Sequence, residues 1–572
     1  MEKNLPCKMR DGVTLYSDVY RPNAEGKFPV LLIRTPYDKD NIGLAIGNQV
    51  HPVHAAQRGY VVLMQDVRGM FTSQGTFDAL NQEVDDGYDT VRWAAGLPYS
   101  NGKVGMFGGS YTGVTQILAA MAKPPELAAI TPRHTSANYY RCWTYQDGAL
   151  LLGFDVLWTI TLCMGEIASA NLPAEEKARQ KKVLALASDN FREVSSRVPL
   201  EKTNVFETLG RAPYFREWLD HPSYDQYWAK TDAAKTLPEV KVPGLHFAGW
   251  YDIFLRGTIE NYVGMVKSGK PQKLVIGPWV HGTDFGSRIG EWDSGFASQG
   301  GVLGVEAMQL RWFDRWLKGL ENGVENEPPV MIYVMGENKW REEKEWPLAR
   351  TVYTKYYLQS GGRANSLVGD GVLAEEPSRL EQRDIFVYDP MNPVPTKGGA
   401  TTGTYPAALN DGVFDQQDIE RRYDILVYTS SVVEKDTEVT GHVKLSMFAS
   451  SSQADTDFTA KLVDVHPDGY ARNVCDGILR ARYRESFEKP KPLIPGNVYQ
   501  LNVDLTATSM LFARGHRIRL EISSSNFPKF DRNLNTGASY SRDGVVKTAL
   551  QTVYHSPQYP SCLILPVIPR TA

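Results

Sequence analysis

The sequence contains little cysteine, and none of it is arranged as a metal site or a disulfide framework. The five cysteines among the 572 residues are scattered and odd in number: Cys7, Cys142, Cys163, Cys475 and Cys562. No C-x-x-C pair and no Cys/His cluster has the spacing of zinc ligands. We therefore expect reduced thiols in a cytoplasmic protein, and no metal.

Long basic runs and long apolar runs are also missing. The formal net charge of −4 gives no electrostatic attraction to nucleic acid or to an anionic membrane, and neither is expected as a partner. The first residues, MEKNLPCKMRDG, lack the apolar region of a signal peptide. The most apolar long stretch, 149–164, contains Asp155 and is too short to span a bilayer, so a buried helix is expected there.

The first third of the chain alternates short apolar runs with helix-like segments. Apolar runs at 28–37, 59–69 and 103–110 end in turn-forming residues, as buried parallel strands do, and 83–96 is typical of a helix between them. The same pattern resumes in 240–252 and 271–282, before a helix at 307–320. This alternation predicts an α/β fold with a doubly wound sheet, formed by 1–137 and 234–349.

Two segments depart from that alternation. Residues 138–233 lose the strand-like runs and are rich in helix formers, which predicts a helical cap inserted into the α/β domain. Residues 350–572 alternate apolar and polar residues between Gly, Pro, Asp and Asn turns. A β domain of two packed sheets, a sandwich or jelly roll, is expected there.

A candidate nucleophile lies in KVGMFGGSYTG, residues 103–113, where an apolar run reaches two glycines and Ser110 before a helix-like segment. A serine between glycines is most often part of a turn, and the G-x-S-x-G pattern would need glycine where Thr112 stands. Asp252 and His281 follow two other predicted strands, giving the order Ser, Asp, His of an α/β-hydrolase triad. Taken singly, the aspartate is typical of a helix cap and the histidine is one of ten.

A family resemblance favours the catalytic interpretation. GGSYTG resembles the G-x-S-Y-x-G elbow of the cocaine esterase family, which is related to X-prolyl dipeptidyl peptidases and α-amino acid ester hydrolases. In that variant the second glycine falls one place later, as Gly113 does. The stretches LIRTPYDKD, DVRGMFTSQGTFD, AGWYDIFLRGT and GPWVHG also look like the family. The resemblance implies an α/β-hydrolase domain, a helical cap and a C-terminal jelly roll.

The resemblance also implies roles for individual residues. It makes Ser110 the nucleophile, His281 the base and Asp252 the carboxylate that orients it. It makes the hydroxyl of Tyr37 and the backbone N–H of Tyr111 the donors to the oxyanion. No cofactor is implied.

The acyl pocket is expected to be apolar. Where aminoester hydrolases place acidic residues two and three positions after the triad aspartate, this chain has Phe254 and Leu255. Trp143 and Trp158 keep the spacing of two tryptophans that line the pocket in cocaine esterase, although core packing in the helical cap is an equal alternative for Trp158. Four acidic residues are candidates to supply a charge from elsewhere in the chain: Asp147, Asp155, Asp284 and Glu291.

These observations predict a serine ester hydrolase for bulky, uncharged or aromatic acyl groups. An amidase or X-prolyl peptidase on the same machinery is the first alternative, because esters and amides share the triad. An inactive hydrolase scaffold whose β domain binds carbohydrate or a partner is the second. The expected partner is a small ester or amide, and a homodimer is the candidate assembly.

Overall fold

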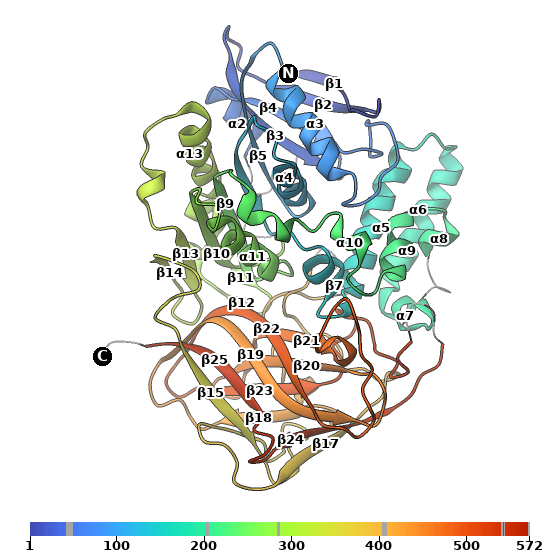
Figure 1. The fold of residues 1–572 in the computed structure, drawn as a ribbon, viewed down its shortest axis with the longest axis vertical. Helices are drawn as coiled ribbons and strands as arrows, with labels where there is room; N and C mark the ends of the chain where they lie inside the picture. The colour runs from blue at the N-terminus through green and yellow to red at the C-terminus, as the bar shows by residue number, and fades with distance from the viewer. Residues whose placement is uncertain are drawn as a thin grey trace.

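The computed structural model describes residues 1–41, 50–200, 205–282, 286–402, 409–538, 542 and 544–569. It has two main layers in Figure 1: a mixed α/β part above and an all-β part below, with a group of helices beside the first.

A ten-stranded sheet forms the centre of the α/β part. Its order is β1-β2-β4-β3-β5-β6-β9-β10-β13-β14, and the strands from β4 to β13 run parallel. The strands are β1 (Glu2–Lys8), β2 (Thr14–Tyr20), β3 (Phe28–Thr35), β4 (Val61–Asp66), β5 (Ser100–Gly109), β6 (Leu127–Arg133), β9 (Gly244–Tyr251), β10 (Gln272–Val280), β13 (Val330–Val334) and β14 (Lys339–Glu343). The strands predicted from the sequence in this part of the chain are therefore confirmed.

Helices cover both faces of this sheet, because its strands are apolar on both sides. In β3, Val30 and Leu32 pack toward α3 and α4, whereas Leu31 and Ile33 pack toward α2 and α13. This is the doubly wound arrangement that continuous apolar strands predict. The helices are α2 (Pro52–Gln57), α3 (Glu83–Ala95), α4 (Tyr111–Ala122), α11 (Leu255–Val266), α12 (Gly300–Leu303) and α13 (Val305–Lys318).

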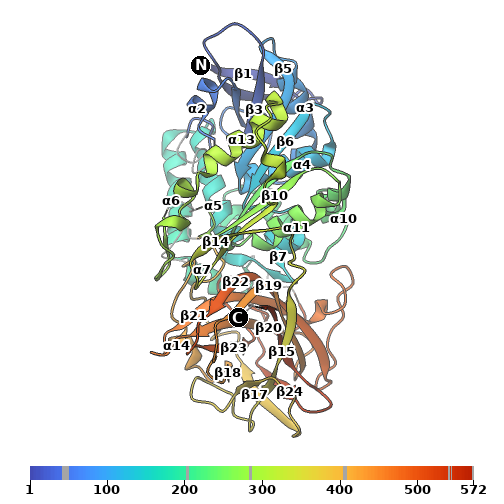
Figure 2. The ribbon, with the colours of Figure 1, turned by 90° about the vertical axis from the view of Figure 1, so that its left-hand side faces the viewer.

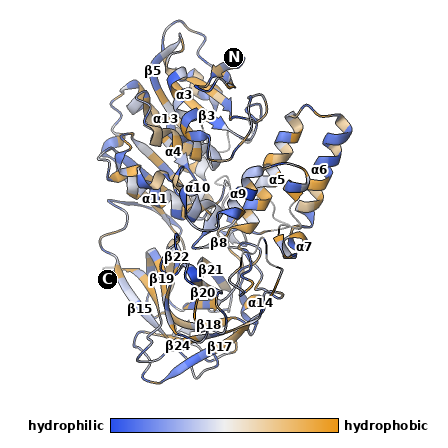
Figure 3. Ribbon diagram, turned by 45° about the vertical axis from the view of Figure 1, so that its right-hand side comes forward, coloured by the Kyte–Doolittle hydropathy of each residue, from blue (hydrophilic) through white to orange (hydrophobic). Residues whose placement is uncertain are grey.

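Between β6 and β9 the chain forms mainly helices, which lie beside the sheet in Figures 1 and 3. They are α5 (Leu152–Ser169), α6 (Ala174–Asp189), α7 (Phe191–Ser196), α8 (Val205–Thr208), α9 (Pro213–Asp220) and α10 (Gln226–Ala229), preceded by the short strands β7 (Tyr145–Gln146) and β8 (Ala149–Leu150). Among the described residues, only α5 has the length and hydropathy of a membrane span, and 67% of it is buried inside the protein. It is the buried helix expected near 149–164.

The C-terminal part is a β domain whose strands join into one hydrogen-bonded network. Its order is β17-β24-β19-β25-β15-β16-β18-β23-β20-β21, with β22 paired to β19. The strands are β15 (Val352–Gln359), β16 (Val372–Ala374), β17 (Gln382–Tyr388), β18 (Leu426–Ser430), β19 (Thr437–Ser451), β20 (Asp457–Val465), β21 (Ala471–Arg480), β22 (Tyr499–Phe512), β23 (Arg517–Ser523), β24 (Ala549–His555) and β25 (Cys562–Ile568).

The α/β part and the β domain share a hydrophobic core. One continuous cluster of buried side chains contains Trp250 and Ile276 from the central sheet together with Phe458 and Leu565 from the β domain. Figure 2 shows the two layers stacked one above the other along the long axis. Burying apolar side chains across this junction stabilises both layers together.

Candidate active site

Ser110 lies on a sharp turn between a strand and a helix. Strand β5 ends at Gly109, α4 begins at Tyr111, and Ser110 itself has φ 58° and ψ −128°. A non-glycine residue in this region is strained, and such strain is typical of a nucleophile elbow. The Ser110 N–H donates to the carbonyl of Arg133 (3.0 Å), which ties the turn to the neighbouring strand β6.

The late glycine of the elbow has a packing reason. A Cβ at Gly113 would lie 2.8 Å from the Cβ of Thr135, so only glycine lets α4 approach the segment after β6 this closely. At position 112 a side chain is useful instead: the Thr112 hydroxyl donates to the carbonyl of Gly109 (2.7 Å). These two contacts explain why the second glycine stands at 113 and not at 112.

The structure brings Ser110, His281 and Asp252 together in a chain of contacts. His281 Nε2 is 3.0 Å from Ser110 Oγ, and His281 Nδ1 is 3.2 Å from Asp252 Oδ1. Asp252 follows β9 and His281 follows β10, which are parallel neighbours, so both side chains emerge at the same edge of the sheet. The Phe254 N–H also donates to Asp252 Oδ1 (2.6 Å) and fixes the carboxylate. This geometry can pass a proton from the serine hydroxyl to the imidazole.

A second histidine, His134, contacts the same carboxylate, and sequence reasoning missed it. Its Nδ1 approaches Asp252 Oδ2, the oxygen that His281 does not use. Burial alone raises the pKa of Asp252, but the two imidazoles more than offset this and hold that pKa well below its ordinary value. His134 follows directly on β6, so the strand-end rule that selected Asp252 and His281 is a signal that could have found it.

Tyr37 lies beside Ser110, in the loop after β3. Its hydroxyl oxygen accepts a hydrogen bond from the Trp158 indole N–H (3.0 Å), so a helix of the cap contacts the reacting groups directly. Burial raises the pKa of the Tyr37 phenol, and contacts of its oxygen with Trp158, Ser110 and the Tyr111 N–H oppose that rise. The phenol and the Tyr111 N–H therefore both lie beside Ser110.

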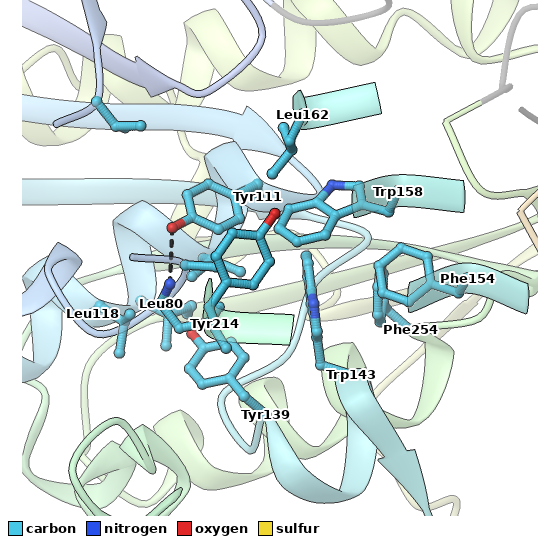
Figure 4. Close-up of a cluster of buried hydrophobic side chains, with 14 of the residues drawn as sticks. Leu80, Tyr111, Leu118, Tyr139, Trp143, Phe154, Trp158, Leu162, Tyr214 and Phe254 are labelled. Atoms are coloured by element: carbon cyan, nitrogen blue, oxygen red, sulfur yellow. Dashed lines mark hydrogen bonds between the residues drawn. The ribbon is translucent and has the colours of Figure 1, made fainter. Parts of the chain in front are cut away.

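Tyr111, the residue after Ser110, is anchored by its own side chain. Its hydroxyl accepts from the Leu80 N–H (2.9 Å) and donates to Glu83 (3.1 Å), which pairs with buried Arg34 (2.5 Å). Figure 4 shows the contact with Leu80 and the aromatic rings gathered around Tyr111. The first turn of α4, which carries the Tyr111 N–H, is thus held by a buried polar network.

An aromatic cluster forms the other side of the site (Figure 4). Trp143 and Phe254 stack with centroids 4.4 Å apart and planes 11° apart, and both are fully buried. The rings of Phe254 and His281 are nearly perpendicular, with centroids 5.1 Å apart and planes 80° apart. Trp158 stacks on Tyr111, with centroids 5.7 Å apart and planes 25° apart. Three of the four predicted pocket residues therefore lie together next to the reacting groups.

Leu255, the fourth, lies elsewhere. Phe254 belongs to the core cluster that includes the cap, whereas Leu255 belongs to the cluster shared with the β domain. Leu255 is the first residue of α11, and the helical rotation of about 100° per residue turns it away from its neighbour. Among the described residues, Leu255 therefore packs with the core shared with the β domain, and its role in acyl binding stays a prediction.

The acidic residues considered as counter-charges have other environments. Asp155 is completely buried, and this burial raises its pKa well above the ordinary value, which disfavours the charged carboxylate. Glu291 accepts from the Asp415 N–H (3.0 Å), far along the chain at the β domain. Asp284 lies outside the described residues.

Asp147 is held by an arginine that joins three parts of the molecule. Arg256, one turn after Asp252, pairs with Asp147 (2.8 Å), which follows β7 in the insertion. The same guanidinium pairs with Asp504 of β22 in the β domain (3.5 Å) and with Glu260 of its own helix (3.3 Å). Asp147 is therefore already neutralised and is not a free anion in the pocket.

Two groups of side chains among the described residues have ligand atoms close enough for a metal ion. One is His134, Asp252 and His281, and the other is Asp464, His466 and His516 in the β domain. In the first group both histidine Nδ1 atoms already contact Asp252, and the remaining ring nitrogen of His281 contacts Ser110. That geometry suits proton transfer better than metal ligation.

Comparison with known proteins identifies the family of the chain. The family model of X-Pro dipeptidyl-peptidases (S15 family) matches residues 11–283, and that of the X-Pro dipeptidyl-peptidase C-terminal non-catalytic domain matches residues 322–564. The cocaine esterase of Rhodococcus sp. (strain MB1 Bresler) is 39% identical over 572 residues, covering 99% of this chain and 98% of that protein.

Solved structures agree over the same length. An aminopeptidase from a marine sediment Thaumarchaeota archaeon superposes with a TM-score of 0.80 at 25% identity, and an α-amino acid ester hydrolase with 0.79 at 26%. Each comparison covers 99% of this chain and 96% of the other. With an α/β-hydrolase domain, a C-terminal β domain and full-length similarity to an esterase, the chain belongs to the cocaine esterase family of serine ester hydrolases.

Proposed function

We propose that Ser110, His281 and Asp252 form the catalytic triad and hydrolyse carboxylic esters through an acyl-enzyme. The observation that carries this proposal is the unbroken contact chain from Ser110 Oγ through both nitrogens of His281 to Asp252. Strain at Ser110 and the burial of Asp252 support it, because both are characteristic of a positioned nucleophile and its orienting carboxylate.

The reaction then follows from the positions of these groups. His281 Nε2 takes the proton as Ser110 Oγ attacks the carbonyl carbon, while Asp252 stabilises the imidazolium. Collapse of the tetrahedral intermediate returns that proton from His281 to the leaving alcohol. A water molecule, deprotonated by His281, then attacks the acyl carbon. The acid leaves as the bond to Ser110 Oγ breaks, and His281 returns the proton to Ser110 Oγ. Hydroxyl, imidazole and water supply every proton transfer and the Asp252 carboxylate stabilises the imidazolium, so the proposal needs no metal or cofactor.

Tyr37 and the backbone N–H of Tyr111 are proposed as the oxyanion donors. Both approach Ser110, and each is anchored, Tyr37 by the Trp158 N–H and Tyr111 by its contact with Glu83. Donors that are already oriented stabilise the oxyanion without reorganising during the reaction.

An acyl group bound to Ser110 is proposed to lie against aromatic rings. Phe254 contacts His281 and Trp158 contacts Tyr37, so these rings border the reacting carbon from two directions. An α-ammonium would lose its hydration there without a counter-charge, since Asp147 is paired with Arg256 and burial disfavours the charged form of Asp155. We therefore propose uncharged or aromatic acyl groups as the substrate class.

Covalent labelling tests the triad. A fluorophosphonate should modify wild-type protein at one serine, and Ser110→Ala should lose both the label and ester turnover, by about 10⁴-fold or more. Ser169→Ala, at an exposed hydroxyl on α5, is the matched control and should keep both. Labelling that persists at another serine in the Ser110→Ala variant would contradict the assignment.

Amide or peptide hydrolysis is the second candidate. The S15 family match and the similarity to an archaeal aminopeptidase favour it. Matched p-nitrophenyl esters and p-nitroanilides of one acyl group separate the two, with faster ester cleavage expected here. A small-molecule substrate agrees with both candidates. The cytoplasmic location, the homodimer and the jelly-roll form of the β domain stay predictions.

A further inference from the structure

The triad aspartate has two histidine partners where the chemistry requires one. Asp252 Oδ1 faces His281, and Asp252 Oδ2 faces His134 from the opposite side. A Ser-His-Asp triad needs only the first contact, which orients the base and stabilises its charged form. The second contact therefore has to be explained by what it does to Asp252.

His134 is held in place independently of that contact. It follows β6 with φ 45°, in the left-handed region, and its N–H donates to the carbonyl of Phe247 in β9 (2.8 Å). Its ring meets Trp279 and His281 edge-on, at 6.5 Å and 5.9 Å between centroids. The side chain is 2% exposed, so its orientation is fixed by its surroundings. An uncommon backbone conformation maintained beside reacting groups points to a role there.

The unpaired nitrogen of His134 indicates its protonation state. His134 Nε2 is buried and has no hydrogen-bond partner among the described residues. A buried N–H without an acceptor costs more than a lone pair left unused. The neutral form, with the proton on Nδ1 and donated to Asp252 Oδ2, is therefore the one that fits the site.

From this geometry we propose that His134 is a positioning residue: it fixes the Asp252 carboxylate and limits how strongly Asp252 stabilises the charged form of His281. The inference rests on the proposed triad. Among the described residues, the charged or titratable groups that face His134 are Asp252 and His281; Arg133 precedes it in β6, and the Arg133 guanidinium lies over the Phe247 ring. One N–H donated to Oδ2 withdraws charge from the oxygen that faces His281.

The sign of the pH effect follows. His281 must be uncharged to accept the proton from Ser110. Without His134, the negative charge of Asp252 acts on His281 alone and stabilises the imidazolium, so a higher pH is needed to free the base. The carboxylate also loses the contact that fixes Oδ2, which should lower turnover at the pH optimum.

The experiment compares two substitutions at one position. His134→Phe keeps a ring but has no nitrogen, so the acid limb of the kcat/KM profile should move up by about 0.5 pH unit or more. In the same variant, kcat at the optimum should fall about three- to tenfold with little change in KM. His134→Asn places an amide N–H near the position of Nδ1, and asparagine tolerates a positive φ. It should restore the wild-type acid limb and most of kcat.

Each measurement is normalised to active sites counted with a fluorophosphonate, so that misfolded protein does not enter kcat. A wild-type profile in His134→Phe would overturn the inference, and so would equal shifts in both variants, which would indicate packing alone. Loss of wild-type activity in a chelator would assign His134 to a metal site instead and would also overturn it. Ser110→Ala, measured in parallel, separates failure of the triad from failure of the His134 role.

Discussion

Ser110, Asp252 and His281 each follow a strand of the central sheet, whereas Trp143, Trp158 and Phe254 are held mainly by contacts with other rings. On the polar side every reacting atom has a defined hydrogen-bond partner. On the aromatic side the contacts are broad, apart from the hydrogen bond from the Trp158 N–H to Tyr37. We therefore expect substitutions on the polar side to change the rate. Those on the aromatic side should change which acyl group is preferred, except for Trp158, which acts on the rate through Tyr37.

The largest effect should come from Asp252→Asn. The asparagine amide would direct an N–H toward His281 Nδ1 and favour the wrong imidazole tautomer, so kcat should fall by about 10⁴. Steady-state kinetics with a p-nitrophenyl ester measures this, and the thermal midpoint reports whether the buried site tolerates the change. A loss of less than tenfold would mean that Asp252 does not orient the base.

Tyr37→Phe should have the next largest effect. It removes one oxyanion donor and keeps the ring, so kcat should fall by about 10²–10³. KM should change little, because the missing interaction is made mainly in the transition state. If kcat stays within a few-fold of the wild-type value, Tyr37 is a packing residue only.

Phe254→Ala tests whether the aromatic side sets the preference for the acyl group. Covering ~80–100 Å² of a phenyl ring contributes about 2 kcal/mol, so the preference for benzoyl over acetyl esters in kcat/KM should fall about 30-fold. Leu255→Ala is the matched control: the adjacent residue packs in the other core cluster, and its variant should keep the wild-type ratio. Equal effects of the two substitutions would remove Phe254 from the pocket. A wild-type preference for α-amino esters over their uncharged analogues would equally contradict the acyl pocket proposed here.

Trp158→Phe should have the smallest effect, because Trp158 acts through Tyr37. Losing the indole N–H removes the bond that orients the phenol, and kcat should fall about fivefold. Trp143→Phe removes the same ring volume from an indole whose N–H has no partner among the described residues, so it controls for packing. If both variants lose the same activity, the hydrogen bond to Tyr37 contributes nothing.

The polar side and the aromatic side of the site also differ in how they could be predicted from the sequence. The chain order Ser, Asp, His and the strand before each residue are local signals, so motif and periodicity are enough to select Ser110, Asp252 and His281 for the site. Their catalytic roles remain the proposal made above. The α/β alternation and the β-rich C-terminal third were likewise predicted, because strand and helix periodicity is encoded locally. The family resemblance selected Tyr37, Trp143 and Phe254, and the structure brings all three next to the reacting groups.

Two features were not predicted, because the contacts that define them are tertiary, although the strand before His134 was a usable signal. Leu255 was expected beside Phe254, but one step along α11 turns it into the core shared with the β domain. His134 belongs to no motif, and it reaches Asp252 only because β6 lies next to β9, with Arg133 opposite Phe247. Sequence spacing contains no information on which strands become neighbours across the insertion.

Arg256 has a consequence for how this enzyme unfolds. Its guanidinium joins Asp147 in the insertion and Asp504 in the β domain, one turn from Asp252. Breaking a buried pair leaves an uncompensated charge, so separating either part disturbs the site itself. Heat or denaturant should therefore abolish esterase activity and β-domain structure in one cooperative transition. A chain ending before Val352 should be an unfolded fragment, not a smaller esterase.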